Sequence, residues 1–154
     1  MRVTSLVAGL AVVLAACSGG DKGAATTADT TASATTTPAP ATAGATHDVD
    51  MVMESPTAYR FVPAELTVKA GDVIRFHNKS GGPHNVAFWS DSIPSGAEAA
   101  IQIADQMAPL TSNMVTEQDG VITVTMGATA PTGDYRYTCQ PHSPMGMHGK
   151  ITVQ

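Results

Sequence analysis

The stretch from Tyr137 to Lys150, YTCQPHSPMGMHGK, constrains the fold most, because it gathers metal-binding side chains in a segment that cannot be a helix. Proline removes a backbone donor and glycine weakens a helix interior, so these residue types favour a loop. Cys139, His142 and Met147 follow one another at steps of three and five. A loop that returns on itself can aim all three side chains at one centre, which neither a helix nor a straight strand does at those steps.

The donor atoms in this stretch indicate copper. Thiolate, imidazole and thioether are soft ligands that select copper over magnesium, calcium or manganese, and zinc sites more often use several Cys or His without a thioether. Copper needs a second imidazole, and His84 is the favoured candidate because the glycines and proline of the preceding loop can fix its side chain. We expect His77 and His47 to be exposed, and His148 to be a surface residue beside the site.

From His47 onward the pattern is that of an all-β domain, with short β-type runs separated by turn residues. Residues 47–154 suffice for a Greek-key β-sandwich of seven to eight strands, and the Ala-rich section 95–107 predicts one short helix. The expected strands are Val49–Met53, Leu66–Val68, Val73–Phe76, Asn85–Trp89, Val121–Met126, Gly133–Cys139 and Lys150–Val153.

Side-chain alternation places the candidate thiol on the core side of its strand. Tyr135, Tyr137 and Cys139 share one face, because alternate residues of a strand point the same way. Core packing is therefore the expected role of the two tyrosines.

The first third of the chain predicts export and anchoring. Residues 1–16 combine Arg2 with an uncharged apolar run that is too short for a membrane span, which is typical of a signal peptide. The sequence LAAC, ending at Cys17, is similar to a bacterial lipobox and predicts cleavage before this cysteine and lipidation of its sulfur. A plain secreted protein is the alternative. Residues 17–46 are rich in Ala, Thr and Pro, and we expect a disordered tether.

Charge and cysteine content narrow the function further. The formal net charge is −5 and there is no basic run, so we expect no nucleic-acid partner. With Cys17 acylated, the exported chain keeps a single thiol, Cys139, in an oxidising compartment, where an unpaired thiol needs protection or a ligand role. We expect a monomer.

The domain resembles a plastocyanin-type cupredoxin along its whole length. The motif that carries the resemblance is C-x-P-H-x-x-x-G-M-x-G-K-I-T-V from Cys139 to Val153, preceded by Phe61-x-Pro63, Gly71-Asp72, Asn78, Pro83-His84-Asn85 and the segment 92–98. This resemblance implies that His84, Cys139, His142 and Met147 bind one type 1 copper. It also implies that Asn85 links the two ligand loops by hydrogen bonds, and a simple turn-capping role is the alternative.

The resemblance implies an electron carrier that exchanges electrons through the edge of His142, across an apolar surface around Pro83, Pro144 and Met145. Plant plastocyanins have an outward Tyr just before the Cys, where this chain has Thr138. This departure does not favour a photosynthetic partner, and a respiratory cytochrome or oxidase is the alternative. A copper storage or delivery lipoprotein of the cell envelope is the alternative function. We expect no enzyme activity, because the sequence has no extra His pair for a second metal centre.

Overall fold

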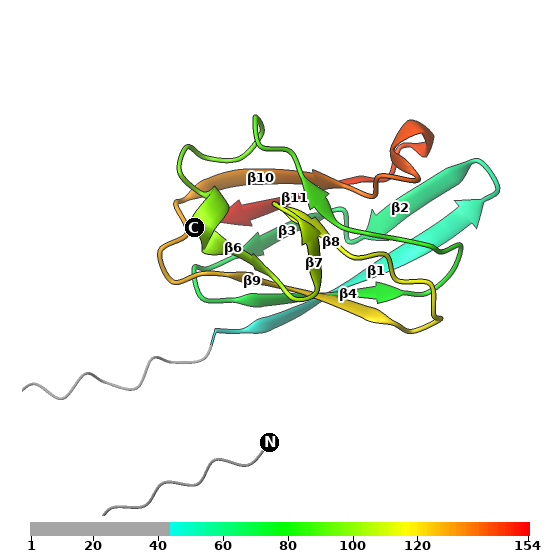
Figure 1. Ribbon diagram of the computed structural model, residues 1–154, viewed down its shortest axis with the longest axis horizontal. Coiled ribbons are helices and arrows are strands. Elements are labelled where there is room, and N and C mark those ends of the chain that lie inside the picture. Colours follow the sequence, from blue (N-terminus) through cyan, green and yellow to red (C-terminus); the bar gives the residue numbers. More distant parts are fainter. Residues whose placement is uncertain (1–43) are drawn as a thin grey trace, which may run out of the picture. The chain divides into compact units, whose positions relative to one another are not determined.

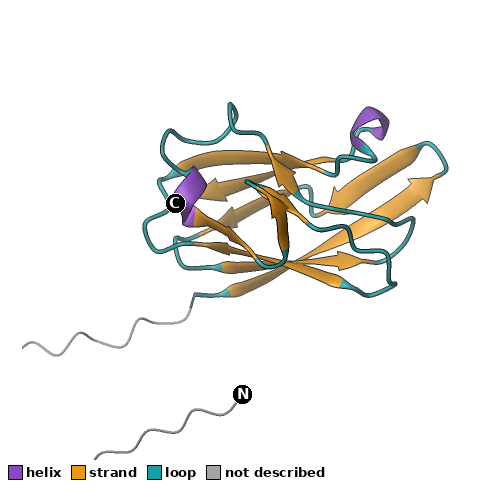
Figure 2. Cartoon of the chain, viewed as in Figure 1, coloured by secondary structure: helices purple, strands orange, loops and turns teal. Residues whose placement is uncertain are grey.

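The computed structural model describes residues 44–154. The predicted signal peptide, the predicted lipidation site at Cys17 and the tether as far as residue 43 lie outside the described residues. Within residues 44–154 the chain forms two β-sheets that face each other across a common core, and Figures 1 and 2 show this all-β architecture. The all-β sandwich expected from the sequence is confirmed.

The first sheet has five strands in the order β2-β1-β4-β9-β6. Its members are β1 (Thr46–Ser55), β2 (Ala58–Val62), β4 (Val73–Asn78), β6 (Ile101–Ile103) and β9 (Val121–Met126). Strands β1 and β4 run parallel, whereas the other neighbours in this sheet are antiparallel. The β1–β2 hairpin is thus at one edge of the sheet.

The second sheet has six strands in the order β3-β11-β10-β5-β8-β7. Its members are β3 (Glu65–Val68), β5 (Ala87–Phe88), β7 (Gln106–Ala108), β8 (Thr111–Ser112), β10 (Gly133–Thr138) and β11 (His148–Val153). Strands β3 and β11 are parallel and the remaining pairs are antiparallel.

The described residues form eleven strands rather than seven or eight, because β2 and three short strands (β6, β7 and β8) were not foreseen. The helix predicted within 95–107 is only the single 3-10 turn η1 (Glu98–Ala100). A second 3-10 turn, η2 (Ser143–Met145), lies in the ligand-rich loop.

The core confirms the side-chain alternation. Tyr135, Tyr137 and Cys139 have no exposed surface. The ring of Tyr137 packs edge-on against Phe61 and Phe76, with centroids 4.8 and 5.3 Å away. Aromatic packing in the core therefore extends along β10 as far as Tyr137, two residues before Cys139.

The ends of the described chain lie far from the turn η2. Gly44, where the described chain begins, lines the same surface hollow as the C-terminal Gln154. In Figure 1 the C-terminus and the η2 turn lie at opposite ends of the long axis. The chain that precedes residue 44 therefore joins the domain far from η2.

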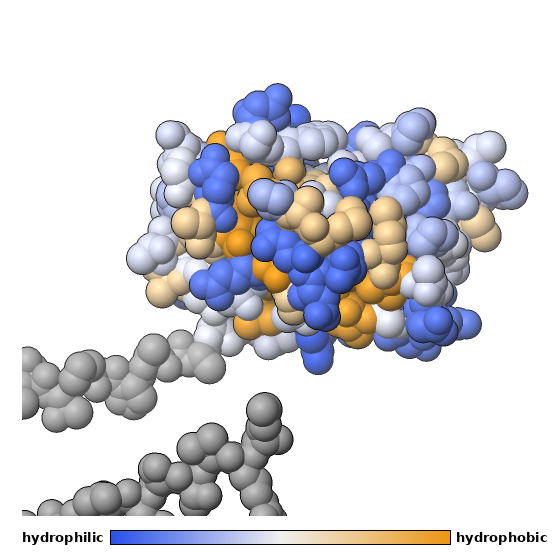
Figure 3. Space-filling view, viewed as in Figure 1, coloured by the Kyte–Doolittle hydropathy of each residue, from blue (hydrophilic) through white to orange (hydrophobic). Residues whose placement is uncertain are grey.

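The face that carries β6, β7 and β8 shows polar and apolar side chains interspersed in Figure 3. Met107 of β7 is the most exposed large apolar side chain among the described residues, at 54%. No helix within residues 44–154 is long and apolar enough to cross a membrane.

Candidate metal centre

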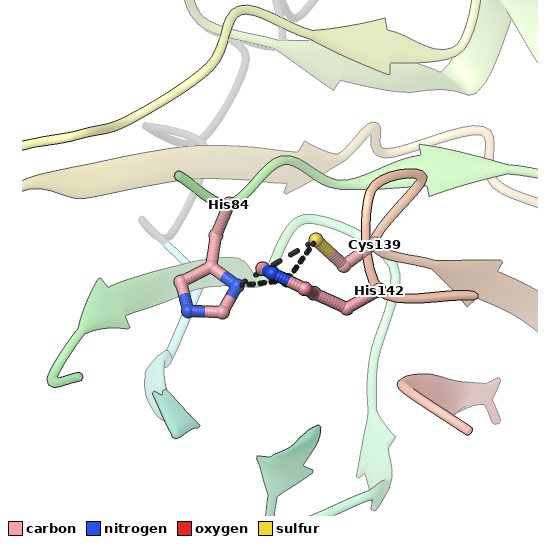
Figure 4. A group of neighbouring side chains, drawn as sticks. All are labelled: His84, Cys139 and His142. Carbon is pink, nitrogen blue, oxygen red and sulfur yellow. Dashed lines mark hydrogen bonds between the residues drawn. The ribbon is translucent and has the colours of Figure 1, made fainter. Parts of the chain in front are cut away.

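Three side chains predicted as ligands converge at one point, which Figure 4 shows in close-up. Cys139 Sγ lies 3.5 Å from His84 Nδ1 and 3.4 Å from His142 Nδ1, and the two Nδ1 atoms are 3.1 Å apart. All three residues are buried. Within the part of the chain that the structure describes, no other group of three His, Cys, Asp or Glu side chains comes together in this way.

The ligand-rich loop returns on itself as its sequence predicts. The backbone N–H of His142 donates to the carbonyl of Cys139, and that of Met147 donates to the carbonyl of His142. The N–H of Cys139 donates to the carbonyl of Met147, which closes the loop. Gly146 has a φ of +83°, a left-handed conformation that glycine adopts without steric cost. The turn η2 therefore brings the chain back to the start of β11.

His84 is held by a separate segment. Its backbone forms an isolated β-bridge with Val115, with hydrogen bonds of 3.0 and 2.8 Å. Its Nε2 lies 2.9 Å from the carbonyl oxygen of Ser80. Because a carbonyl only accepts, Nε2 carries the proton, and the lone pair of Nδ1 faces Cys139 and His142.

Asn85 links the two ligand segments, as the resemblance implied. Its Oδ1 accepts from the backbone N–H of Gln140 at 2.8 Å, and its Nδ2 donates to the side chain of Gln140 at 2.8 Å. The Gln140 side chain was not predicted to take part. This pair of bonds fixes the start of the Cys139 loop against the His84 loop.

The electrostatics keep the donor atoms neutral until a cation binds. Burial lowers the pKa of His84, although the Ser80 carbonyl opposes this shift. Burial also lowers the pKa of His142, and proximity to His84 adds to the effect. Burial raises the pKa of the Cys139 thiol, against hydrogen bonds from the backbone N–H groups of Asn85 and His142. Both imidazoles are therefore available as neutral ligands.

The geometry fits a bound metal ion. Two imidazole lone pairs that face each other at 3.1 Å repel unless a proton or cation lies between them. The centre of a triangle of this size is about 2 Å from each corner, close to a metal–nitrogen bond length. A thiolate and two imidazoles in one plane are the donor set of blue-copper sites.

The two methionines of the loop differ in burial. Met147 is fully buried, and its backbone is hydrogen-bonded to both Cys139 and His142. Met145 is only half-buried and lies in η2. Burial therefore favours Met147 as the fourth donor.

Of the two histidines, only His142 reaches the surface. His84 has no exposed surface, whereas His142 is 7% exposed. Pro83 and Pro144, predicted to surround it, are exposed. These two prolines therefore contribute exposed apolar surface to the loops that carry the two histidines.

Three residues outside the ligand set differ from the sequence expectations. His47 is half-buried and donates from Nε2 to Asp72 at 2.9 Å, and His77 is half-buried and donates to Asp48 at 2.7 Å, so neither is freely exposed. Thr138 is not exposed. It is buried, donates to the carbonyl of Met147 and accepts from Nδ1 of the exposed His148. His148 is a surface residue, as expected.

Sequence reasoning also missed an aromatic contact. The ring of Tyr59 stacks on the imidazole of His142, with centroids 3.8 Å apart and planes 6° from parallel. The spacing of residues in the sequence carries no signal for a contact between β2 and a loop more than eighty residues later.

A β-sandwich with a buried cysteine thiol and two imidazoles at one end defines the cupredoxin class. The family described as copper binding proteins, plastocyanin/azurin family, matches residues 46–154. The chain belongs to this copper-binding family.

Individual relatives agree with this assignment. The chain is 43% identical over 98 residues to chloroplastic plastocyanin of Chlamydomonas reinhardtii, a match that covers 63% of this chain and 60% of that protein. It is 36% identical over 98 residues to plastocyanin of Rumex obtusifolius, covering 63% of this chain and 90% of that one. The match to the minor plastocyanin isoform of Arabidopsis thaliana covers only 50% of that protein. The chain thus spans well under two thirds of some of these relatives.

A solved pseudoazurin structure from Sinorhizobium meliloti is also similar. It has a TM-score of 0.50 and 28% identity, and the match covers 71% of this chain and 73% of that one.

Proposed function

We propose that the chain is an electron carrier that uses one type 1 copper bound by His84, Cys139, His142 and Met147. The observation that carries the proposal is the buried triangle of one sulfur and two nitrogens, with edges of 3.1 to 3.5 Å. Copper bound there would supply one-electron exchange between Cu(I) and Cu(II).

The protein's own residues keep this site rigid. The Asn85–Gln140 bonds, the Ser80 carbonyl and the backbone bonds of η2 hold the donors in place before any metal binds. Outer-shell partners of this kind fix the orientation of ligands. A site whose ligands move little between two charge states reorganises little, which favours fast electron exchange.

Electrons pass through the edge of His142 in this proposal. It is the one histidine of the pair with exposed surface, and Pro83 and Pro144 beside it offer an apolar area for a redox partner. The partner is a donor or acceptor protein of the cytochrome or oxidase class. Because Thr138 is buried, it cannot serve as an outward contact for a partner as the Tyr of plant plastocyanins does.

The location proposed is the cell envelope. A lipid on Cys17 anchors the chain to a membrane, and residues 18–46 connect this anchor to the domain. The domain faces away from the cytoplasm after export. One acyl chain holds a protein only marginally, so stable anchoring requires more than one.

Copper storage or delivery is the competing function, because the same donors would serve it. A carrier exchanges electrons reversibly while it keeps its metal, whereas a delivery protein must release it. Catalysis is not part of the proposal, because four protein donors leave no open position for a substrate.

Copper titration of the purified chain tests the proposal. Wild-type protein should develop an intense blue thiolate-to-copper band at one equivalent and give a reversible one-electron wave. Cys139→Ser should lose the band completely and bind copper at least about 100-fold more weakly, because the thiolate supplies both the colour and much of the bonding. His148→Gln, next to the site, is the matched control and should stay blue. A blue Cys139→Ser variant would sink the assignment.

A further inference from the structure

His142 lacks the restraint that fixes the other histidine. His84 Nε2 donates to the Ser80 carbonyl, as metal-binding histidines usually do with their second nitrogen. Among residues 44–154, no group forms a hydrogen bond with His142 Nε2. The loop backbone positions the Cα of His142, but it does not set the angle of the imidazole plane.

Tyr59 supplies the missing restraint. Its ring covers one face of the His142 imidazole, with centroids 3.8 Å apart and an interplanar angle of 6°. The same ring meets His84 in an edge-to-face arrangement at 6.1 Å. Tyr59 therefore contacts both imidazoles of the site.

The hairpin that carries Tyr59 is itself tied to the site. Tyr59 pairs with Met53 across the β1–β2 hairpin, and the backbone N–H of Met53 donates to Ser80 Oγ at 3.0 Å. A Cβ at Gly81, where φ is +75°, would overlap the side chains of both Met53 and Tyr59. The close approach of this loop to the hairpin therefore requires glycine. Ser80, which bonds His84, and Tyr59, which stacks on His142, therefore belong to one packed unit.

The stacking geometry suits a metal-bound imidazole. Two electron-rich rings avoid a face-to-face arrangement, because their negative faces repel. An imidazole that has donated a lone pair to a cation is electron-poor, and an electron-rich phenol ring attracts it. The stack at 6° is therefore most favourable when the site holds its metal.

We propose that Tyr59 is a positioning residue of the copper site: its ring, rather than a hydrogen bond, sets the plane of the His142 imidazole and keeps it through oxidation and reduction. This inference rests on the proposed electron-carrier function. It assigns to β2 a role in electron transfer that neither the ligand motif nor the family match specifies.

The test compares Tyr59→Phe, which keeps the ring, with Tyr59→Leu and Tyr59→Met, which keep an apolar side chain without one. In the metal-free full chain, the His142 ring protons should be shifted upfield by the Tyr59 ring current in NMR spectra. Tyr59→Phe should retain that shift, and Leu and Met should lose it. Because two variants without a ring are used, the comparison still holds if one of the two folds poorly.

In the copper-loaded chain, the electron-transfer rate at an electrode should fall about two- to tenfold for the Leu and Met variants. This factor is the rate change that corresponds to the free energy of one aromatic stack. The electron-transfer rate of Tyr59→Phe should stay within about twofold of the wild-type rate. Rates at an electrode do not depend on docking of a partner protein, so they report on the site itself.

The outcomes separate the two proposals. A wild-type chain with no blue band would refute the electron-carrier function. If all chains are blue but the Leu and Met variants match wild type in rate, the positioning role is overturned and the carrier function stands. Slow transfer in Tyr59→Phe as well as in Leu would assign the effect to the hydroxyl and also overturn the inference.

Discussion

At the scale of single residues, the two candidate histidines are held by different means. His84 is fully buried and its second nitrogen is bonded to Ser80, so its tautomer and its plane are fixed by the fold. His142 is slightly exposed and lies against Tyr59. The candidate site therefore combines a fully buried histidine held by a hydrogen bond with a slightly exposed histidine held by an aromatic stack.

The identity of the axial donor can be tested with the two methionines of the loop. Met147 is fully buried and bonded through its backbone to Cys139 and His142, whereas Met145 lies half-buried in η2. We expect Met147→Gln to change the visible spectrum strongly and to lower the reduction potential, because an amide oxygen is harder than a thioether and favours Cu(II). A tenfold change in relative affinity corresponds to about 59 mV for one electron, and we expect a fall of at least that size.

Met145→Leu is the matched control. It should leave the spectrum and the potential nearly unchanged and alter at most the exchange rate with partner proteins, because Met145 is the half-buried methionine of η2 and Met147 the fully buried one. Visible spectra and voltammetry of both variants decide the matter. A large spectral change in Met145→Leu alone would show that the wrong methionine has been chosen.

At the scale of elements, Asp72 joins the turn after β3 to the start of β1. The carboxylate is buried and accepts from the backbone N–H groups of Lys69 and Ala45 and from Nε2 of His47. Burial alone would raise its pKa, but the bonds from Lys69, His47 and Ala45 outweigh burial and lower the pKa of Asp72. The charged form is therefore favoured in the folded state.

This shift determines a pH dependence. A carboxylate whose pKa is lowered on folding stabilises the native state above its unfolded pKa of about 3.9, and that stability is lost as pH falls through the folded value. Asp72→Ala should reduce the free energy of unfolding of the copper-free chain by about 1–3 kcal/mol at pH 7, because two backbone N–H donors in partly buried hydrogen bonds lose a charged acceptor. The same variant should lose less further stability below pH 4 than wild type does.

Asp48→Ala is the control. Asp48 is a carboxylate of β1 that is bonded to Arg75 and His77, but unlike Asp72 it is exposed. Exposed ion pairs contribute little to stability, so this variant should unfold at nearly the wild-type denaturant concentration. Urea titrations at pH 7 and pH 3.5 provide the measurement. If the two variants lost the same free energy of unfolding, Asp72 would not be what holds the turn after β3 against the start of β1.

The elements also show how far the sequence could predict the structure. The long strands β1, β4, β9, β10 and β11 were predicted, because their alternation reports burial on one face. The two- or three-residue strands β6, β7 and β8 were not, because such short segments show no period and form only where a neighbouring strand offers partners. Thr138 was expected to point outward, but β11 brings His148 over it.

The candidate site was predictable to the extent that it is local. Cys139, His142 and Met147 belong to one loop, and their spacing alone indicates a common centre. His84 depended on the resemblance as well as on its loop. The contacts of Tyr59 and Gln140 join segments distant in the sequence, and only the folded structure brings them together.

At the scale of the whole molecule, the site and the start of the domain lie apart. Gly44 and Gln154 line one surface hollow, while η2 lies at the opposite end of the domain in Figure 1. Gly44, where the proposed tether joins the domain, is therefore remote from η2. The anchored carrier proposed above would need such a separation, because it must present one end to a redox partner.

The anchor itself is tested by Cys17→Ser, which removes the sulfur proposed to carry lipid. We expect wild-type protein to sediment with membranes, and Cys17→Ser, once cut free of residues 1–16, to move into the soluble fraction, because the remaining polar segment has no apolar surface to hold it. Cys139→Ser is the matched control, since it also removes one thiol but should stay with the membranes. Fractionation, with the mass of each mature chain measured to confirm cleavage and the added lipid, gives the result. If mature Cys17→Ser remains on membranes as fully as wild type, the proposed lipid anchor is wrong and the domain itself, or another partner, holds the chain there.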